Sequence, residues 1–177
     1  QAERAGDIVK NLLDFSRTER PAFSALPPGE VVRSTLALLR NQIMLSGVSL
    51  ESDAPEGLPA LRGNLRNLQQ VFMNLLLNAM QATPPGGRIR FSVAAEGREY
   101  VRFEVRDTGK GMEPETLQHI FEPFYTTKEV GRGTGLGLAV TYAIVKRHGG
   151  RIEVQSEPGQ GSVFFVHIPQ AQPGSEP

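Results

Sequence analysis

Asp107-Thr-Gly-Lys-Gly-Met112 and Gly131-Arg-Gly-Thr-Gly-Leu-Gly137 are the two glycine-rich stretches that decide which fold we expect for this chain. An aromatic loop, Phe121-Glu-Pro-Phe-Tyr-Thr-Thr-Lys128, lies between them in the sequence. A helix-forming segment that carries Asn74 and Asn78 one turn apart precedes all three. Four segments of this kind, separated in the sequence, predict one pocket built from different parts of a single domain.

The composition of the 177 residues narrows the classes of function. Apolar residues make up 39%, enough for a core, and no apolar run approaches the roughly 18 residues of a membrane span. The 19 basic and 19 acidic side chains cancel, so we expect neither a nucleic-acid partner nor membrane contact by this segment. The absence of cysteine excludes disulfides, thiolate metal sites and cysteine nucleophiles, and it fits a reducing compartment.

Hydrophobic periodicity predicts an α+β fold. Apolar residues at helical spacing predict helices at 30–45, 64–82, 114–120 and 136–148. Alternating residues predict strands at 48–52, 88–95, 100–106, 151–156 and 162–168, with a weaker candidate at 58–62. The sum is a two-layer sandwich, in which helices cover one face of a mixed, mostly antiparallel sheet.

We expect four parts along the chain: 1–20, 21–29, 30–169 and 170–177. The first is a helix with an apolar stripe at Ile8, Leu12 and Phe15. It is either a packing helix of the main domain or half of a hairpin whose other half is missing, because the chain begins at Gln1 and we interpret it as a fragment. Prolines and Gly29 predict a linker next, then the main domain, then a disordered tail.

An amide stripe follows one side of the helix 64–82. Its members are Asn67, Gln70, Asn74, Asn78 and Gln81. The stripe could be a plain solvent face, but Asn lowers helix propensity there, and Lys or Glu would serve better. An amide oxygen is a neutral, hard ligand for Mg²⁺ beside phosphates, whereas a carboxylate would repel them. The helix alone leaves both interpretations open, and the other motifs, counted with it, favour the ligand interpretation.

Asp107 directly follows a predicted strand. Its ionised carboxylate only accepts hydrogen bonds, and adenine offers an exocyclic amine where guanine presents an oxygen. Gly109 and Gly111 would let the backbone approach the base without a Cβ clash. By itself, Asp107-Thr-Gly is more typical of a turn.

The segment 131–137 alternates glycine and then opens a helix, so its N–H groups and the helix N-terminus fit phosphate binding. It matches neither the P-loop nor the dinucleotide fingerprint, and the alternative is a flexible linker. Lys128 and Arg132 could contact phosphate oxygens, with Phe121 and Phe124 anchoring their loop. We expect no catalytic role for the histidines, because no pair has metal-ligand spacing.

Together these segments resemble the ATP-binding domain of sensor histidine kinases, in the superfamily shared with gyrase, heat-shock chaperone and mismatch-repair ATPases. The resemblance covers roughly residues 26–169. The N box matches 67–82, the G1 box 107–112, the F box 121–124 and the G2 box 131–137. It implies a Bergerat-type ATP-binding fold. The loop 121–128 is similar to that of the nitrogen-regulation branch.

The resemblance also implies roles for individual residues. Asn78 would ligate Mg²⁺, Asn74 would assist near the phosphates, and Asp107 would hold adenine. Asn74 and Lys128 are the candidate catalytic residues. The other implied nucleotide contacts are Gly109, Gly111, Arg132, Gly133, Thr134, Gly135, Leu136 and Gly137. Hydrolysing relatives place Glu at the position of Asn74, so hydrolysis here should be slow and the γ-phosphoryl group kept for transfer.

One family element is missing. The phosphoacceptor His of these kinases is followed by Glu or Asp, but here Ile120, Gly149 and Ile168 follow the three histidines. Residues 1–20 resemble the end of the second dimerisation helix. The fragment should therefore bind ATP and Mg²⁺ and phosphorylate a His on separate dimerisation helices. The implied further partner is the receiver domain of a response regulator.

The implied full-length protein is a homodimer in the cytoplasm, either free or as the cytoplasmic part of a membrane-bound sensor. Two alternatives stay open. One is a protein Ser/Thr kinase of the anti-sigma type. The other is an interaction module in which ATP binding exposes a partner surface without phosphoryl transfer.

Overall fold

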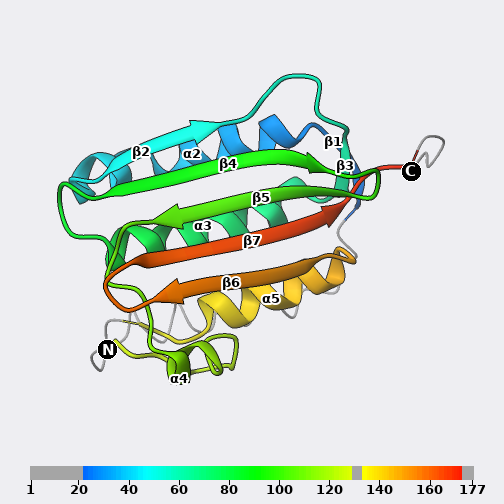
Figure 1. Ribbon diagram of the computed structural model, residues 1–177. Helices are drawn as coiled ribbons and strands as arrows, with labels where there is room; N and C mark the ends of the chain where they lie inside the picture. Colours follow the sequence, from blue (N-terminus) through cyan, green and yellow to red (C-terminus); the bar gives the residue numbers. More distant parts are fainter. Residues whose placement is uncertain (1–21, 129–132, 173–177) are drawn as a thin grey trace, which may run out of the picture.

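Three helices cover one face of a five-stranded sheet in the computed structural model, which describes residues 22–128 and 133–172 (Figure 1). In spatial order the strands are β2 (Ser49–Asp53), β4 (Arg88–Glu96), β5 (Tyr100–Asp107), β7 (Gly161–Pro169) and β6 (Arg151–Glu157). The covering helices are α2 (Pro28–Ser46), α3 (Leu65–Ala82) and α5 (Gly137–Arg147). A short helix, α4 (Pro114–Leu117), lies at one end of this layer, beside the start of α5.

The sheet is mixed. β2 and β4 run parallel, because β3 and α3 come between them in the sequence, and the other neighbouring strands pair antiparallel. β1 (Ser24–Leu26) and β3 (Leu61–Gly63) form a separate two-stranded sheet. This is the two-layer α+β sandwich that the hydrophobic pattern predicts.

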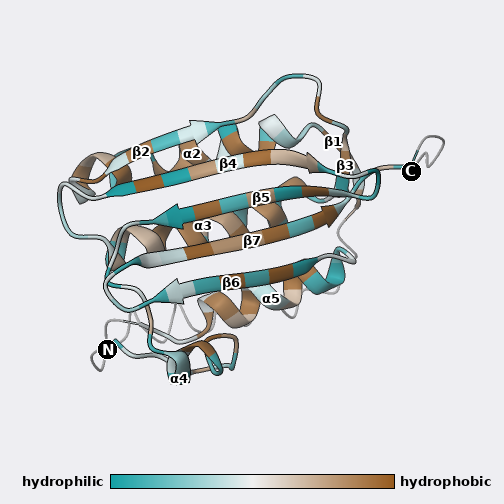
Figure 2. Ribbon diagram, in the orientation of Figure 1, coloured by the Kyte–Doolittle hydropathy of each residue, from teal (hydrophilic) through white to brown (hydrophobic). Residues whose placement is uncertain are grey.

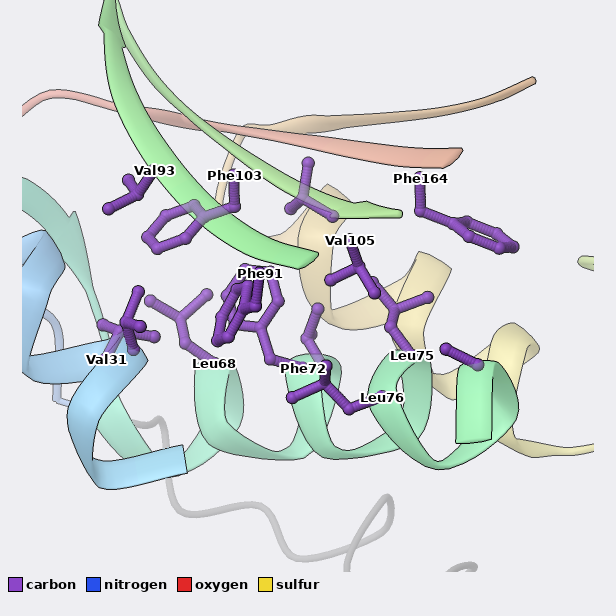
Figure 3. Close-up of a cluster of buried hydrophobic side chains, with 14 of the residues drawn as sticks. Val31, Leu68, Phe72, Leu75, Leu76, Phe91, Val93, Phe103, Val105 and Phe164 are labelled. Carbon is purple, nitrogen blue, oxygen red and sulfur yellow. The ribbon is translucent and has the colours of Figure 1, made fainter. Parts of the chain in front are cut away.

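The core lies between the helices and the sheet, with α3 at its centre. Hydrophobic and hydrophilic residues alternate along β4 and β5, so one face of each strand is apolar (Figure 2). Phe72 of α3 meets this face, with ring centroids 5.1 Å from Phe91 and 4.6 Å from Phe103 (Figure 3). All three rings are fully buried, so α3 is held firmly on the sheet.

Helix α3 begins where the sequence predicts. The side chain of Asn64 accepts a hydrogen bond from the backbone N–H of Asn67 at 3.0 Å, which satisfies one free donor of the first turn. Burial of the apolar face of α3 in the core sets the rotation of the helix and so the direction of its amide stripe. No helix in the part of the chain that the structure describes has the length and hydropathy of a membrane span.

The structure corrects several expected boundaries. The expected linker 21–29 contains β1 and the start of α2, because residues 24–26 find a partner in β3. That partner begins at Leu61, later than the expected strand 58–62. The helix expected to reach residue 120 ends at Leu117. The expected helix 1–20 lies outside the described residues.

The expected tail 170–177 is ordered over its first residues. The backbone N–H of Gln170 donates to Glu99 O, and that of Ala171 donates to Ala60 O, both at 2.8 Å. Edge pairing of the backbone, which side-chain composition does not reveal, explains this order. Residues 173–177 lie outside the described residues.

Candidate functional site

A cavity of about 1100 Å³ lies between α3, the end of β5 and the start of α5. The four predicted segments meet there, because neighbouring strands and helices bring their ends to the same edge of the sandwich. The predicted site residues that line it are Asn74, Asn78, Asp107, Gly111, Lys128, Gly133, Thr134, Gly135 and Gly137. Arg132 lies outside the described residues.

Asp107 lines the cavity at the end of β5 and is only 5% exposed. Its Oδ1 accepts hydrogen bonds from the backbone N–H groups of Gly109 at 2.8 Å and Ser162 at 3.3 Å. Burial raises the pKa of this carboxyl, and the two hydrogen bonds partly offset the rise. Within the described residues Oδ2 accepts no hydrogen bond, so it is available to a donor on a bound molecule.

Asn74 ties the middle of α3 to the start of α5. Its Nδ2 donates to Gly137 O at 3.0 Å and lies 3.3 Å from Thr141 Oγ1. These contacts orient the side chain and hold the first turn of α5 at the cavity. The N–H groups of that turn are the ones an anion would use.

Asn78 and Gln81 lie one turn apart on α3 and direct their amide oxygens to the same cation. The ammonium of Lys128 lies 3.4 Å from Asn78 Oδ1 and also contacts Gln81 Oε1. Partial burial, followed by the positive charge of Lys110, lowers the pKa of Lys128. The structure therefore places a positive charge on the amide that the sequence predicts as a metal ligand.

Gly135 closes the turn that leads into α5. Its φ is +68°, and a Cβ there would lie 2.4 Å from the carbonyl carbon of Phe124. Phe124 itself has a φ of 66°, unusual for a residue with a side chain, and its N–H donates to Gly135 O at 2.9 Å. The aromatic loop and the second glycine segment thus pack backbone against backbone, which requires glycine at 135.

Three predicted residues have other surroundings than expected. A Cβ at Gly109 would meet Ala82 O at 2.5 Å, so this glycine lets the loop pack against the end of α3, and it does not line the cavity. Gly111 lines the cavity, but a Cβ there would lie 1.9 Å from Glu157 O. Leu136 is buried at the N-cap of α5 and does not line the cavity either.

Several lining residues escaped the sequence analysis. The apolar walls include Leu77, Met112, Ile120, Leu138 and Phe164. Ser162 reaches Asp107 because β5 and β7 pair in a register that sets these two residues opposite each other. Gln81 belongs to the predicted amide stripe, and its spacing from Asn78 was the signal that could have identified it.

Comparison with known proteins identifies the family of this chain. Residues 63–172 match the family model of histidine kinase-, DNA gyrase B- and HSP90-like ATPases. The chain is 37% identical over 169 residues to the sensor histidine kinase ZraS of Klebsiella oxytoca, an alignment that covers 96% of this chain. The chain spans only 36% of the length of that relative.

Two solved structures share the fold. The structure of full-length ShkA in complex with AMPPNP has a TM-score of 0.82 and 27% identity, over 94% of this chain and 36% of that one. Histidine kinase ThkA in complex with the response regulator TrrA has a TM-score of 0.77 and 26% identity, over 96% of this chain and 48% of that one. The chain therefore belongs to the histidine kinase-, DNA gyrase B- and HSP90-like ATPase family, and within it to the catalytic domains of histidine kinases.

Proposed function

We propose that the cavity binds ATP with Mg²⁺ and that the domain donates the γ-phosphate to a histidine of a separate dimerisation domain. The observation that carries this proposal is the pairing of two groups in one cavity. The buried carboxylate of Asp107 offers the adenine amine an acceptor, Oδ2, that no described residue uses, and the amide oxygen of Asn78 already accepts a cation. Full-length ShkA was solved in complex with AMPPNP, an ATP analogue, which supports the choice of nucleotide.

The residues at the cavity fit Mg²⁺. The described residues contain no group of three or more His, Cys, Asp or Glu side chains that could hold a metal by themselves. Mg²⁺ commonly takes one or two protein ligands and fills its other positions with phosphate oxygens and water. Asn78 Oδ1 fits such a ligand because it accepts a hydrogen bond from the ammonium of Lys128, so it already interacts with a cation. No carboxylate of the described residues takes part in this contact.

The remaining residues supply alignment, which is the main requirement of phosphoryl transfer. Bound Mg²⁺ would neutralise charge on the phosphate oxygens. The first turn of α5, held by Asn74, would direct N–H groups at the phosphates, and Lys128 would add a positive charge. Asn74 is an amide and cannot activate water as a general base, which favours transfer over hydrolysis.

The acceptor histidine would come from another domain. His148 uses both ring nitrogens in hydrogen bonds, and His167 is buried with Nδ1 2.6 Å from Glu96 Oε2. His119 is half-buried, and its Nδ1 lies 2.8 Å from Glu122 Oε1. We assign residues 1–20 to the second dimerisation helix of a homodimeric, cytoplasmic kinase of the nitrogen-regulation branch, with 30–169 as the catalytic domain.

The further partner would be the receiver domain of a response regulator. ThkA was solved with such a protein, TrrA, which supports this choice. The regulator would take the phosphate from the histidine onto an Asp.

A labelling experiment tests the proposal. The chain is mixed with Mg²⁺, ATP labelled at the γ-phosphate, and a separate protein that carries the acceptor helices of a histidine kinase. Label on that protein that is lost in acid and kept in alkali indicates phosphohistidine and supports transfer. Acid-stable label on Ser indicates the anti-sigma type of kinase, and nucleotide binding without label indicates an interaction module.

A further inference from the structure

Gln81 lines the cavity and makes a contact that has no role in the proposed function. It lies on α3 one turn beyond Asn78, and residues three apart on a helix lie on the same face. The side-chain amide oxygens of Asn78 and Gln81 both contact the ammonium of Lys128. Lys128 lies 47 residues after Gln81 in the sequence. We call Asn78 Oδ1 and Gln81 Oε1 the amide pair.

The backbone around Lys128 supports this position. The N–H of Lys128 donates to Thr126 Oγ1 at 3.1 Å, which shapes the turn before the side chain. Gly133 lies against the aliphatic stem, since a Cβ there would meet Lys128 Cδ at 3.0 Å. The stem is thus guided toward α3, and within the described residues the acceptors of its ammonium are the amide pair.

Two cations that share one amide oxygen repel each other. Asn78 Oδ1 is the group that fits Mg²⁺, and an ammonium within hydrogen-bond distance of it repels a divalent ion. We propose that Gln81 is a positioning residue that holds Lys128 on the amide pair in the nucleotide-free protein, so that Lys128 must leave before the metal of the nucleotide reaches Asn78.

Nucleotide binding would change the partners of Lys128. Lys128 leaves two neutral oxygens and gains phosphate oxygens, while the metal takes its place at Asn78. This inference rests on the proposed binding of Mg²⁺ and nucleotide in the same cavity. The competent fraction of the protein is the one in which Lys128 has left the amide pair, and the apparent dissociation constant rises as that fraction falls.

Removing Gln81 should therefore tighten binding. Contacts of exposed charged groups are weak, so Gln81→Ala should lower the dissociation constant of ADP with Mg²⁺ by roughly two- to fivefold. The gain should vanish when Lys128 is replaced, because no ammonium then holds the pair. Gln70→Ala is the matched control, since Gln70 belongs to the same amide stripe but does not line the cavity.

The experiment is a double-mutant cycle of Gln81→Ala and Lys128→Met, with ADP and Mg²⁺ titrated into each variant in a calorimeter and unfolding measured for each. Tighter binding by Gln81→Ala in the parent, and none in Lys128→Met, supports the inference. An equal change in both backgrounds means that Gln81 acts directly on the nucleotide, and no change in either means that it is a plain surface residue. Both of these results overturn the inference and leave the proposed function standing.

A parent protein that binds no ADP with Mg²⁺ would overturn the proposed function together with the inference. The nucleotide-free protein offers a second measurement. The side-chain amide resonances of Gln81 and Asn78 should shift on Lys128→Met and stay in place in Gln70→Ala. Unchanged resonances in Lys128→Met would contradict the contact itself.

Discussion

The ring nitrogen Nε2 of His148 accepts a hydrogen bond from the backbone N–H of Asn64 at 3.1 Å, which joins the end of α5 to the start of α3. The other ring nitrogen, Nδ1, donates to Ile144 O at 2.8 Å, so the ring is neutral and its tautomer is fixed. The ring of Phe23 packs against it in a T-shaped arrangement, with the ring centroids 4.7 Å apart. Both helices that border the cavity are thus fastened to each other at the far end.

The fastening should depend on pH. Burial lowers the pKa of His148 below its ordinary value of 6.5, with the charge of Arg147 adding to the effect. The unfolded chain then binds a proton more readily than the folded one between that pKa and 6.5. The free energy of unfolding should be constant above pH 6.5 in this respect and fall as the pH drops toward the folded pKa. Urea unfolding between pH 7.5 and 5 measures this.

His148→Phe serves as the comparison for that titration. It keeps the ring but leaves the N–H of Asn64 without an acceptor, so it should cost about 1–3 kcal/mol of stability at pH 7.5. The slope that His148 contributes below pH 6.5 should disappear. An identical slope in parent and variant would assign the pH dependence to other groups.

Asp107→Asn should weaken ATP binding by roughly 1–3 kcal/mol. The backbone N–H groups of Gly109 and Ser162 would hold the new amide oxygen at the place of Oδ1, so its NH₂ would face the adenine amine, donor against donor. Titration calorimetry with ATP and with GTP checks this. The parent should prefer ATP, and equal affinity for the two nucleotides would rule out our account of Asp107.

Asn78→Ala should remove the dependence of nucleotide binding on Mg²⁺ and leave the fold intact. We expect the affinity in Mg²⁺ to fall at least about tenfold, or about 1.4 kcal/mol, while the affinity in EDTA changes little. Asn67→Ala is the matched control, because Asn67 shares the amide stripe of α3 but does not line the cavity. An unchanged response to Mg²⁺ in Asn78→Ala would exclude Asn78 from the metal site.

Gly135→Ala should damage the site more than its backbone conformation alone explains. Gly135 and Gly57 both have positive φ, so alanine at either position costs about 1–2 kcal/mol of strain. A Cβ at Gly57 meets nothing within 4 Å, whereas one at Gly135 meets the backbone of Phe124 at 2.4 Å. We expect Gly135→Ala to lose nucleotide affinity and Gly57→Ala to keep it. Equal affinities would show that the contact between Gly135 and Phe124 is not needed for binding.

The periodicity of the chain predicted most of the fold, because amphipathic helices and alternating strands are local patterns. The helix 64–82 with its cap at Asn64 is an example, and the structure places α3 at Leu65–Ala82. β1 at Ser24–Leu26 was missed, since three residues in a proline-rich stretch become a strand only through pairing with β3. Short edge pairings depend on the partner, so local sequence carries little signal for them.

The candidate site divides in the same way. The residue types alone predicted the kinds of group in the site, which are a carboxylate at Asp107, an amide at Asn78 and glycines before α5. In the structure, Asn74 donates a hydrogen bond to the start of α5, whereas Asn78 and Gln81 accept from Lys128. The spacing of the stripe does not predict this difference, because it depends on which segment packs against each turn of α3. Gly109 likewise has Ala82 as its neighbour, a contact set by the end of α3.

The sequence by itself determined most of the elements, the apolar faces and the set of groups that we propose to bind a nucleotide, because these follow from side-chain chemistry and spacing along one segment. Only the tertiary structure decided which groups touch: Ser162 on Asp107, His148 on Asn64, and Lys128 on the amide pair. Strand register and helix packing bring together residues that lie 47 to 84 positions apart in the sequence. A pattern within one segment cannot predict contacts between residues so far apart along the chain.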